Sequence, residues 1–176
     1  CFGVGISFQM ALKNCHQHSW DITASEAISV QRELAPLVRV APLTKTPATI
    51  AGVDMSVGRA GVQAAVVVLR LPDLVVVDST VWRGPVSFPY VPGLLSFREA
   101  PAVLGALGEL SIWPVVIRAD AHGRAHPRRF GLACHLGVLL EMPAIGVAKS
   151  RLTGKHQQPG REKGAVTPLV DRDETI

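Results

Sequence analysis

The chain has 176 residues, of which 48% are hydrophobic and 18% are charged, so it can bury an apolar core and is typical of one soluble domain. Its formal net charge of +4 fits a polyanionic partner, although an excess of this size is also common in proteins that bind nothing acidic. Its apolar runs are much shorter than the roughly 20 residues of a membrane-spanning helix, so the sequence predicts no transmembrane segment.

The three cysteines, Cys1, Cys15 and Cys134, are an odd number without C-x-x-C spacing, which argues against a disulfide framework and predicts a reduced, cytoplasmic protein. Residues 1–22 lack the features of a signal peptide, and we expect them to form a disordered leader of unknown role. Residues 23–176 are expected to form one folded domain. Because the sequence does not begin with methionine, we expect a fragment of a longer protein.

Helical spacing of apolar residues predicts a first helix from Ala24 to about Pro36. Three β-rich runs follow, and turns short enough for hairpins separate them, so they predict an antiparallel meander. These runs are Thr49–Val57, Val62–Leu71 and Leu74–Val81.

The second half of the chain alternates helix and strand. Helices are predicted over Ser96–Leu110 and His126–Met142, and strands over Pro114–Ala119 and Ala144–Ala148. Such alternation implies parallel pairing with a right-handed crossover. The sequence therefore predicts an α/β fold with a mixed sheet, in which a three-strand antiparallel meander precedes a parallel βαβ unit flanked by helices. The segment after Lys149 is expected to be a surface loop.

Three acidic residues occupy unusual positions in the predicted elements. Asp54 interrupts an apolar strand, where burial of an unpartnered carboxylate would be costly, so a cation or hydrogen-bond donors should meet it. Asp120 ends a strand beside the parallel crossover, where open α/β sheets place their sites. Glu99 lies at the beginning of a helix that can reach the same sheet edge.

If the three carboxylates converge, they offer the hard oxygen ligands that magnesium or manganese prefers. A phosphodiester is then the natural substrate, because a bound metal activates water and neutralises charge on phosphoryl oxygens. In the alternative interpretation the acids serve structure, as acceptors for backbone amides, a turn cap and a complement to a helix N-terminus. Their spacing alone does not decide between the two.

Residues 121–130 hold two histidines and three arginines at a predicted helix start. Pro127 fits a first helical turn, and free amides together with Arg128 or Arg129 suit a phosphate. His126 could position a water or a phosphate. The alternatives are a solvated arginine face and a histidine that only caps the helix.

Two further residues are candidates for work on a nucleic acid. Lys149 closes the last strand at the same sheet end as Asp120, where an ammonium can act electrostatically or simply extend into solvent. Tyr90 lies between Pro89 and Pro92, which hold its ring outward as a wedge between bases would be held. Core packing is the alternative fate of this tyrosine.

Four ordered blocks of this sequence resemble the endonuclease V family, and the resemblance runs from about Ala24 to the C-terminus. The blocks are Ala51–Asp54, Pro89–Glu99, Asp120–Arg128 and Gly146–Ser150.

The resemblance implies a ribonuclease-H-like fold, a Mg²⁺ ion, or Mn²⁺, held by Asp54, Glu99 and Asp120, and catalytic roles for His126 and Lys149. It also implies the nature of the reaction, which is hydrolysis of the second phosphodiester 3′ to deoxyinosine, leaving a 3′-hydroxyl and a 5′-phosphate. It further implies that Tyr90, Gly93, Gly123 and Gly146 bind the nucleic acid. With the residues argued above, the expected nucleic-acid-binding residues are Tyr90, Pro89, Pro92, Gly93, Gly123, Arg128 and Gly146.

The sequence departs from the family at both ends. Residues 1–21 match nothing in the family pattern, and the family continues beyond Ile176 with a strand pair, a histidine-bearing loop and a closing helix. We therefore expect this chain to be poorly stable and weakly active.

Three other interpretations stay open. The first is a related enzyme that cuts inosine-containing RNA, because the sequence does not reveal a contact to a 2′-hydroxyl. The second is a non-catalytic nucleic-acid-binding module, and the third, with poor spacing, is a zinc site of His122, His126 and Cys134. We expect a monomer whose partner is DNA with deoxyinosine or other damaged bases.

Overall fold

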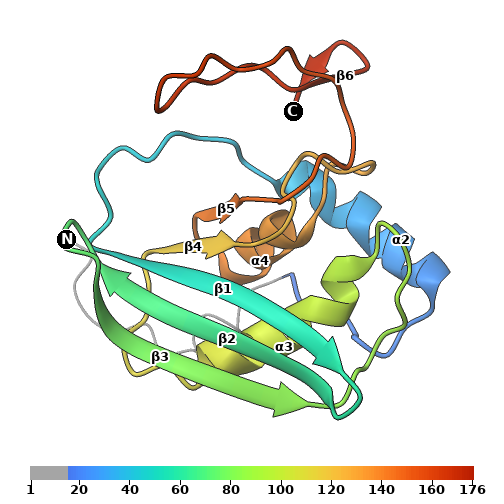
Figure 1. Cartoon of the computed structure of the whole chain (residues 1–176). Coiled ribbons are helices and arrows are strands. Elements are labelled where there is room, and N and C mark those ends of the chain that lie inside the picture. The colour runs from blue at the N-terminus through green and yellow to red at the C-terminus, as the bar shows by residue number, and fades with distance from the viewer. Residues whose placement is uncertain (1–15) are drawn as a thin grey trace.

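The computed structural model describes residues 16–176 and shows one mixed sheet of five strands with helices packed against it (Figure 1). The strand order is β3-β2-β1-β4-β5. This order confirms the predicted α/β fold, in which a meander at one edge of the sheet is followed by parallel strands at the other.

The meander consists of β1 (Thr49–Gly58), β2 (Gly61–Arg70) and β3 (Val75–Gly84), which pair antiparallel in sequence order. The β1–β2 hairpin is tight, since Gly58 pairs with Gly61. The two parallel strands are short: β4 (Val116–Ala119) pairs with β1, and β5 (Ala144–Gly146) pairs with β4.

The main core lies between the sheet and two helices, α3 (Leu95–Gly108) and α4 (Leu132–Leu140), which contact one another. Strand β2 has the strict alternation of a sheet with one packed face, because Val62, Ala64, Val66 and Val68 are buried and their neighbours are not. Each fully buried valine of this kind stabilises the fold by about 1.5–3 kcal/mol.

The helix α2 (Ala24–Leu34) is fixed at its start by a capping box. The Thr23 side chain accepts a hydrogen bond from the Glu26 amide at 3.3 Å, and the Glu26 carboxylate accepts one from the Thr23 amide at 2.8 Å. A 3₁₀ turn, η1 (Ala35–Leu37), ends the helix near the predicted Pro36. The buried Ala27 and Leu34 join α2 to the clusters around Phe97 and Phe130 respectively.

The helix predicted over His126–Met142 is wrong in its first six residues, because only Leu132–Leu140 is helical. Residues 120–131 form a loop that two backbone hydrogen bonds close, from the Gly131 amide to the Gly123 carbonyl at 3.0 Å and from the Ala133 amide to the His122 carbonyl at 3.1 Å. Pro127 therefore does not occupy a first helical turn.

A small hairpin was not predicted in the segment after Lys149. It consists of β6 (Val170–Asp171) and β7 (Glu174–Thr175), and the two residues between them, Arg172 and Asp173, both have positive φ. Two-residue hairpin turns favour this backbone conformation, which arginine rarely adopts, so the turn has no sequence signature.

Residues 16–22 are the described part of the predicted leader, and the rest of it, with Cys1 and Cys15, lies outside the described residues. Here Trp20 packs against the core, and the His18 ring nitrogen Nε2 lies 2.8 Å from Nε2 of His135. Ordered contacts therefore begin before Thr23. No helix between residues 16 and 176 combines the length and apolarity needed to cross a membrane.

Candidate active site

Three carboxylates from three different elements line one small cavity of about 30 Å³. Asp54 comes from β1, Glu99 from α3 and Asp120 from the residue after β4. The strand register explains the pairing of the two aspartates, because Val53 lies opposite Ala119 in the parallel ladder and the Asp120 amide donates to the Val53 carbonyl at 3.2 Å. The rest of the lining is apolar, from Val53, Met55, Val103 and Leu132.

Asp54 is exposed, so the expectation that its carboxylate is buried in the strand is wrong. Ala51 and Val53 are buried, and the two-residue alternation of a strand places Asp54 on the other side. Its Oδ1 accepts a hydrogen bond from the Met55 amide at 2.8 Å. The side chain is thus available to a ligand at the cavity.

The electrostatics of the cavity favour a cation. Burial, together with the negative charges of Asp54 and Asp120, raises the pKa of Glu99 to about 7, although Arg98 partly opposes the shift. Carboxylates that repel one another in this way are the donor set that a hard divalent ion stabilises. Among residues 16–176 no three acidic, histidine or cysteine side chains already form a closed metal site, so the fit rests on the chemistry of these donors.

Lys149 lies just beyond β5 and brings the only ammonium that is ion-paired to these acids in the described part of the chain. Its Nζ is 2.6 Å from Oδ2 of Asp120, and this hydrogen bond, with the charges of Asp120 and Asp54, raises the pKa of Lys149. The Lys149 side chain is 83% exposed, and such exposed ion pairs contribute little to stability. The ammonium can therefore turn to another anion at little cost.

Tyr90 lies in the segment between β3 and α3 and is 69% exposed. Its neighbour Phe88 is buried and packs against Phe97, which fixes the start of the segment to the core. Pro89 and Pro92 flank the ring and restrict the backbone on either side. The tyrosine thus projects from an anchored loop and does not pack into the core.

The far end of this loop is held by one carbonyl group, that of Gly93, which we call the Gly93 anchor. Three side chains donate to it: Gln31 Nε2 at 3.1 Å, His126 Nε2 at 3.0 Å and Arg128 Nη2 at 2.7 Å. Gly93 has a φ of +78°, a conformation that strongly favours glycine. The loop of Tyr90 is thereby tied to both α2 and the 120–131 loop.

His126 is buried and belongs to this anchor, and it is not among the residues that line the carboxylate cavity. Its Nε2 donates to the Gly93 carbonyl and its Nδ1 accepts from the Arg128 amide at 3.2 Å, a pattern that only the neutral ring allows. Burial, with the nearby Arg128 charge, lowers the pKa of His126 to about 4.

Gln31 was missed by the sequence reasoning, although it is fully buried. Besides its bond to Gly93, its Nε2 donates to the Phe130 carbonyl at 3.0 Å and its Oε1 accepts from Arg128 Nε. Arg128 is therefore largely engaged within the protein. A polar residue on the apolar face of a predicted amphipathic helix was the one available signal.

Gly146 on β5 lies against the 120–131 loop so closely that no side chain fits there. A Cβ atom at Gly146 would lie 2.6 Å from the Ala121 carbonyl oxygen and 2.7 Å from the Gly123 amide nitrogen. The backbones of β5 and of residues 121–123 therefore form one surface beside Asp120.

The zinc alternative finds no support in these contacts. Both ring nitrogens of His126 are engaged, and His122 Nε2 lies 2.8 Å from the Ser150 carbonyl oxygen. Burial raises the pKa of the Cys134 thiol to about 11, whereas a zinc ligand must lose its proton.

His135 is a second buried residue that the sequence did not single out. Its ring is enclosed by His18, Trp20, Phe97 and Phe130, and its Nδ1 has no hydrogen-bond partner among the described residues. Burial, with the charge of His18, lowers the pKa of His135 to about 3. The neutral ring is thus part of the folded structure, and protonation opposes folding.

We expect the free energy of unfolding to fall below pH 6.5, with His135 contributing about 1.4 kcal/mol per pH unit, because the unfolded chain then binds a proton that the folded chain excludes. The stabilisation is complete above the unfolded pKa and is lost as the pH falls toward 3. His135→Phe removes this contribution, so urea titrations at pH 7 and pH 5 should differ less than in the parent. The exposed His156→Gln serves as control, and an equal pH dependence in all three proteins would contradict the prediction.

The strand order and the acidic cavity where β1 meets β4 define the ribonuclease-H-like class of α/β fold. The family model described as Endonuclease V matches residues 32–176. An endonuclease V from Nostoc sp. is 48% identical over 162 residues, which cover 90% of this chain and 73% of the relative. One from Roseiflexus castenholzii is 47% identical, and the match covers 94% of this chain and 74% of the relative.

Solved structures agree with these relatives. The endonuclease V of Streptomyces avermitilis has a TM-score of 0.84 at 44% identity, covering 90% of this chain and 71% of its own. The endonuclease V of Ciona intestinalis has a TM-score of 0.66 at 31% identity, and the match covers 73% of this chain and 59% of the Ciona chain. The Ciona structure is a complex with a 23mer DNA containing an inosine followed by a ribo-adenosine. The chain belongs to the endonuclease V family, a family of DNA repair nucleases that act on deaminated bases.

Proposed function

We propose that the protein is a metal-dependent endonuclease that hydrolyses the second phosphodiester bond 3′ to deoxyinosine and leaves a 3′-hydroxyl and a 5′-phosphate. The observation that carries this proposal is the convergence of Asp54, Glu99 and Asp120 on one cavity. The family and the inosine-containing DNA in the Ciona intestinalis complex support the choice of substrate. A monomer in the cytoplasm stays our prediction.

The three carboxylates are the residues that would hold Mg²⁺ or Mn²⁺. The bound ion would supply Lewis-acid chemistry, which makes water a better nucleophile and neutralises charge on the phosphate. Lys149 places its ammonium beside Asp120, where it can stabilise negative charge that develops on the scissile phosphate. Burial and the neighbouring carboxylates raise the pKa of Glu99 to about 7, so a nearby positive charge would favour its ionised form at neutral pH.

The lesion would be recognised beside this cavity. Tyr90 would insert between bases as a wedge, held in place by Pro89, Pro92 and the Gly93 anchor. Gly146 lets the backbone of residues 121–123, which includes Gly123, pack directly against β5, and these adjoining backbones would contact a flipped base. His126 and Arg128 would act through the position of the loop, because their hydrogen bonds are directed to Gly93.

Tyr90→Ala is expected to lower cleavage of a deoxyinosine duplex at least tenfold and to affect a single-stranded inosine substrate much less, because a single strand needs no separation. Its melting temperature should be unchanged, since the ring is 69% exposed. Initial rates on the two substrates give the ratio, with Tyr90→Phe as the variant that keeps the ring. An equal loss on both substrates would speak against a wedge.

Cleavage of inosine-containing RNA is the second candidate function. The specific observation in its favour is the ribo-adenosine that follows the inosine in the nucleic acid bound by the Ciona intestinalis relative. A preference of this kind needs a contact to the 2′-hydroxyl of that nucleotide.

One experiment tests both candidates. End-labelled duplexes carry deoxyinosine, deoxyadenosine, or inosine followed by a ribonucleotide at one position, and each is incubated with Mg²⁺, Mn²⁺ or chelator. The proposal expects metal-dependent nicking one nucleotide beyond the deoxyinosine and none with deoxyadenosine. Faster cleavage at the ribonucleotide would select the RNA candidate, and binding without any cleavage would select a non-catalytic module.

A further inference from the structure

A second cavity, of about 620 Å³, lies between the C-terminal end of α2 and the 120–131 loop, apart from the carboxylates. Its polar lining consists of four arginines: Arg32, Arg124, Arg128 and Arg129. Its remaining walls are apolar, from η1 and the residues that follow it. We call it the arginine cavity.

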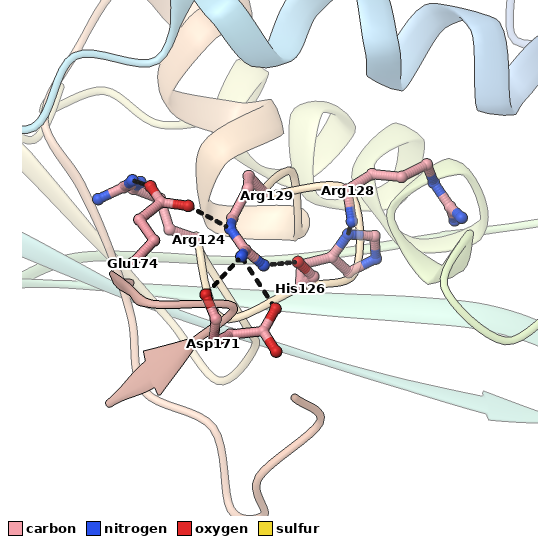
Figure 2. Close-up of polar contacts among 6 residues, drawn as sticks. All are labelled: Arg124, His126, Arg128, Arg129, Asp171 and Glu174. Carbon is pink, nitrogen blue, oxygen red and sulfur yellow. Dashed lines mark hydrogen bonds and ion pairs between the residues drawn. The ribbon is translucent and has the colours of Figure 1, made fainter. Parts of the chain in front are cut away.

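Only half of these guanidinium groups are neutralised by carboxylates of the described residues. Arg129 lies 2.9 Å from Asp171 and 3.1 Å from Glu174, and Arg124 is paired with Glu174, as Figure 2 shows. Both acids come from the β6–β7 hairpin. Between residues 16 and 176 no carboxylate forms an ion pair with Arg32 or Arg128.

Arg32 and Arg128 lie close enough to repel one another. Burial, and then the charge of Arg32, lowers the pKa of Arg128. Arg128 is held in this position by neutral partners, the Gln31 side chain and the Gly93 carbonyl. Arg32 stands in the last turn of α2, where the helix dipole favours a cation, but the dipole does not account for a second arginine in the lining of the same cavity.

We propose that the arginine cavity binds a backbone phosphate of the nucleic-acid substrate, separate from the phosphate that is cut. Guanidinium groups bind phosphate oxygens bidentately, and an anion here would relieve the repulsion between Arg32 and Arg128. The inference rests on the proposed function, because the strand must be held at Tyr90 for its flanking phosphates to reach the cavity.

The position of Arg128 connects the two sites. Arg128 is among the residues that line the arginine cavity, and its guanidinium donates to the Gly93 anchor, which fixes the loop of Tyr90. A phosphate bound in the cavity therefore affects the position of the Tyr90 loop through Arg128. Asp171 and Glu174 compete with it for Arg129 and Arg124, so the hairpin limits how strongly the cavity attracts an anion.

The test measures the binding of a fluorescent deoxyinosine duplex by anisotropy, in chelator and over a range of salt concentrations. Arg32→Gln is expected to weaken binding about three- to tenfold at low salt and to make the slope of log K against log salt shallower by about one, the signature of one lost phosphate contact. Arg32→Lys should keep the slope. The control is Arg83→Gln, an equal change of charge on the edge strand β3, where Arg83 is also exposed.

A variant with the opposite expected sign sharpens the test. Glu174→Gln frees Arg124 and one side of Arg129, so it should tighten binding and steepen the slope, whereas Glu162→Gln gives an equal change of charge without releasing either arginine. Equal effects of Arg32→Gln and Arg83→Gln, or an unchanged slope in Arg32→Gln, would overturn the inference. Failure of the parent protein to cleave the same duplex with Mg²⁺ counts against the proposed nuclease, since the binding measurement contains no metal.

Discussion

Asp54→Ala is expected to abolish cleavage of the deoxyinosine duplex, with a loss of more than about a hundredfold, because even groups that only orient metal ligands change activity by 10–100-fold. The Asp54 side chain is exposed and accepts a hydrogen bond from the neighbouring Met55 amide, so its removal should leave the free energy of unfolding nearly unchanged. Loss of one negative charge should also bring the pKa of Glu99 down toward its ordinary value.

Three measurements on each variant separate chemistry from folding. Initial cleavage rates with Mg²⁺ give the catalytic loss, anisotropy in chelator gives DNA affinity, and urea titration gives stability. Asp73→Ala is the control, because Asp73 is an exposed residue of the β2–β3 turn whose only ion pair within residues 16–176 is with Arg70 at the end of β2. Full activity in Asp54→Ala would refute the role of the carboxylate cavity. An equal loss of activity in Asp54→Ala and Asp73→Ala would show that the effect is not specific to the cavity.

Gln31→Leu is expected to destabilise the fold by about 2–4 kcal/mol, since it leaves the buried Phe130 carbonyl and the Arg128 Nε group without their partners. Leucine has a similar volume, so the change removes hydrogen bonds and does not open a cavity. The Gly93 carbonyl loses one of its three donors, and the loop of Tyr90 should become less well positioned.

The positioning role has its own signature. If Gln31 acts through the loop, Gln31→Leu should raise KM for duplex substrate more than for single-stranded substrate, at a temperature where the variant is fully folded. Gln31→Glu, which keeps the acceptor for Arg128, should restore part of the stability. The exposed Gln63→Leu is the control. A stable Gln31→Leu protein with unchanged substrate preference would remove Gln31 from this role.

The sheet and the carboxylate cavity were accessible from the sequence because strand periodicity and short turns are local signals. Asp54 and Asp120 follow two β-branched runs, and parallel pairing of those runs brings the aspartates together through the Val53–Ala119 register. The exposure of Asp54 also follows from the two-residue alternation of a strand, since the neighbouring Val53 faces the core. The expectation of a buried Asp54 was wrong because alternate residues of β1 face opposite sides of the sheet.

Other features depend on contacts that no local pattern encodes. The helix prediction from His126 failed because the backbone of residues 120–131 bonds back on itself, and the Arg129 φ of +57° ends any helical path. The Gly93 anchor joins Gln31, Gly93 and Arg128, which are far apart in the sequence. The arginine cavity likewise depends on how α2 meets the 120–131 loop.

The two aspartates and the loop of Tyr90 also differ in how their backbones are held. Strands β1 and β4 each have hydrogen-bonded neighbours on both sides, so Asp54 and Asp120 stand on or beside a backbone whose amides should exchange with deuterium only when the whole domain opens. Tyr90 and Lys149 stand on segments outside any strand ladder. On warming, local opening should therefore disturb recognition of the damaged base at temperatures where the acidic cluster is still intact.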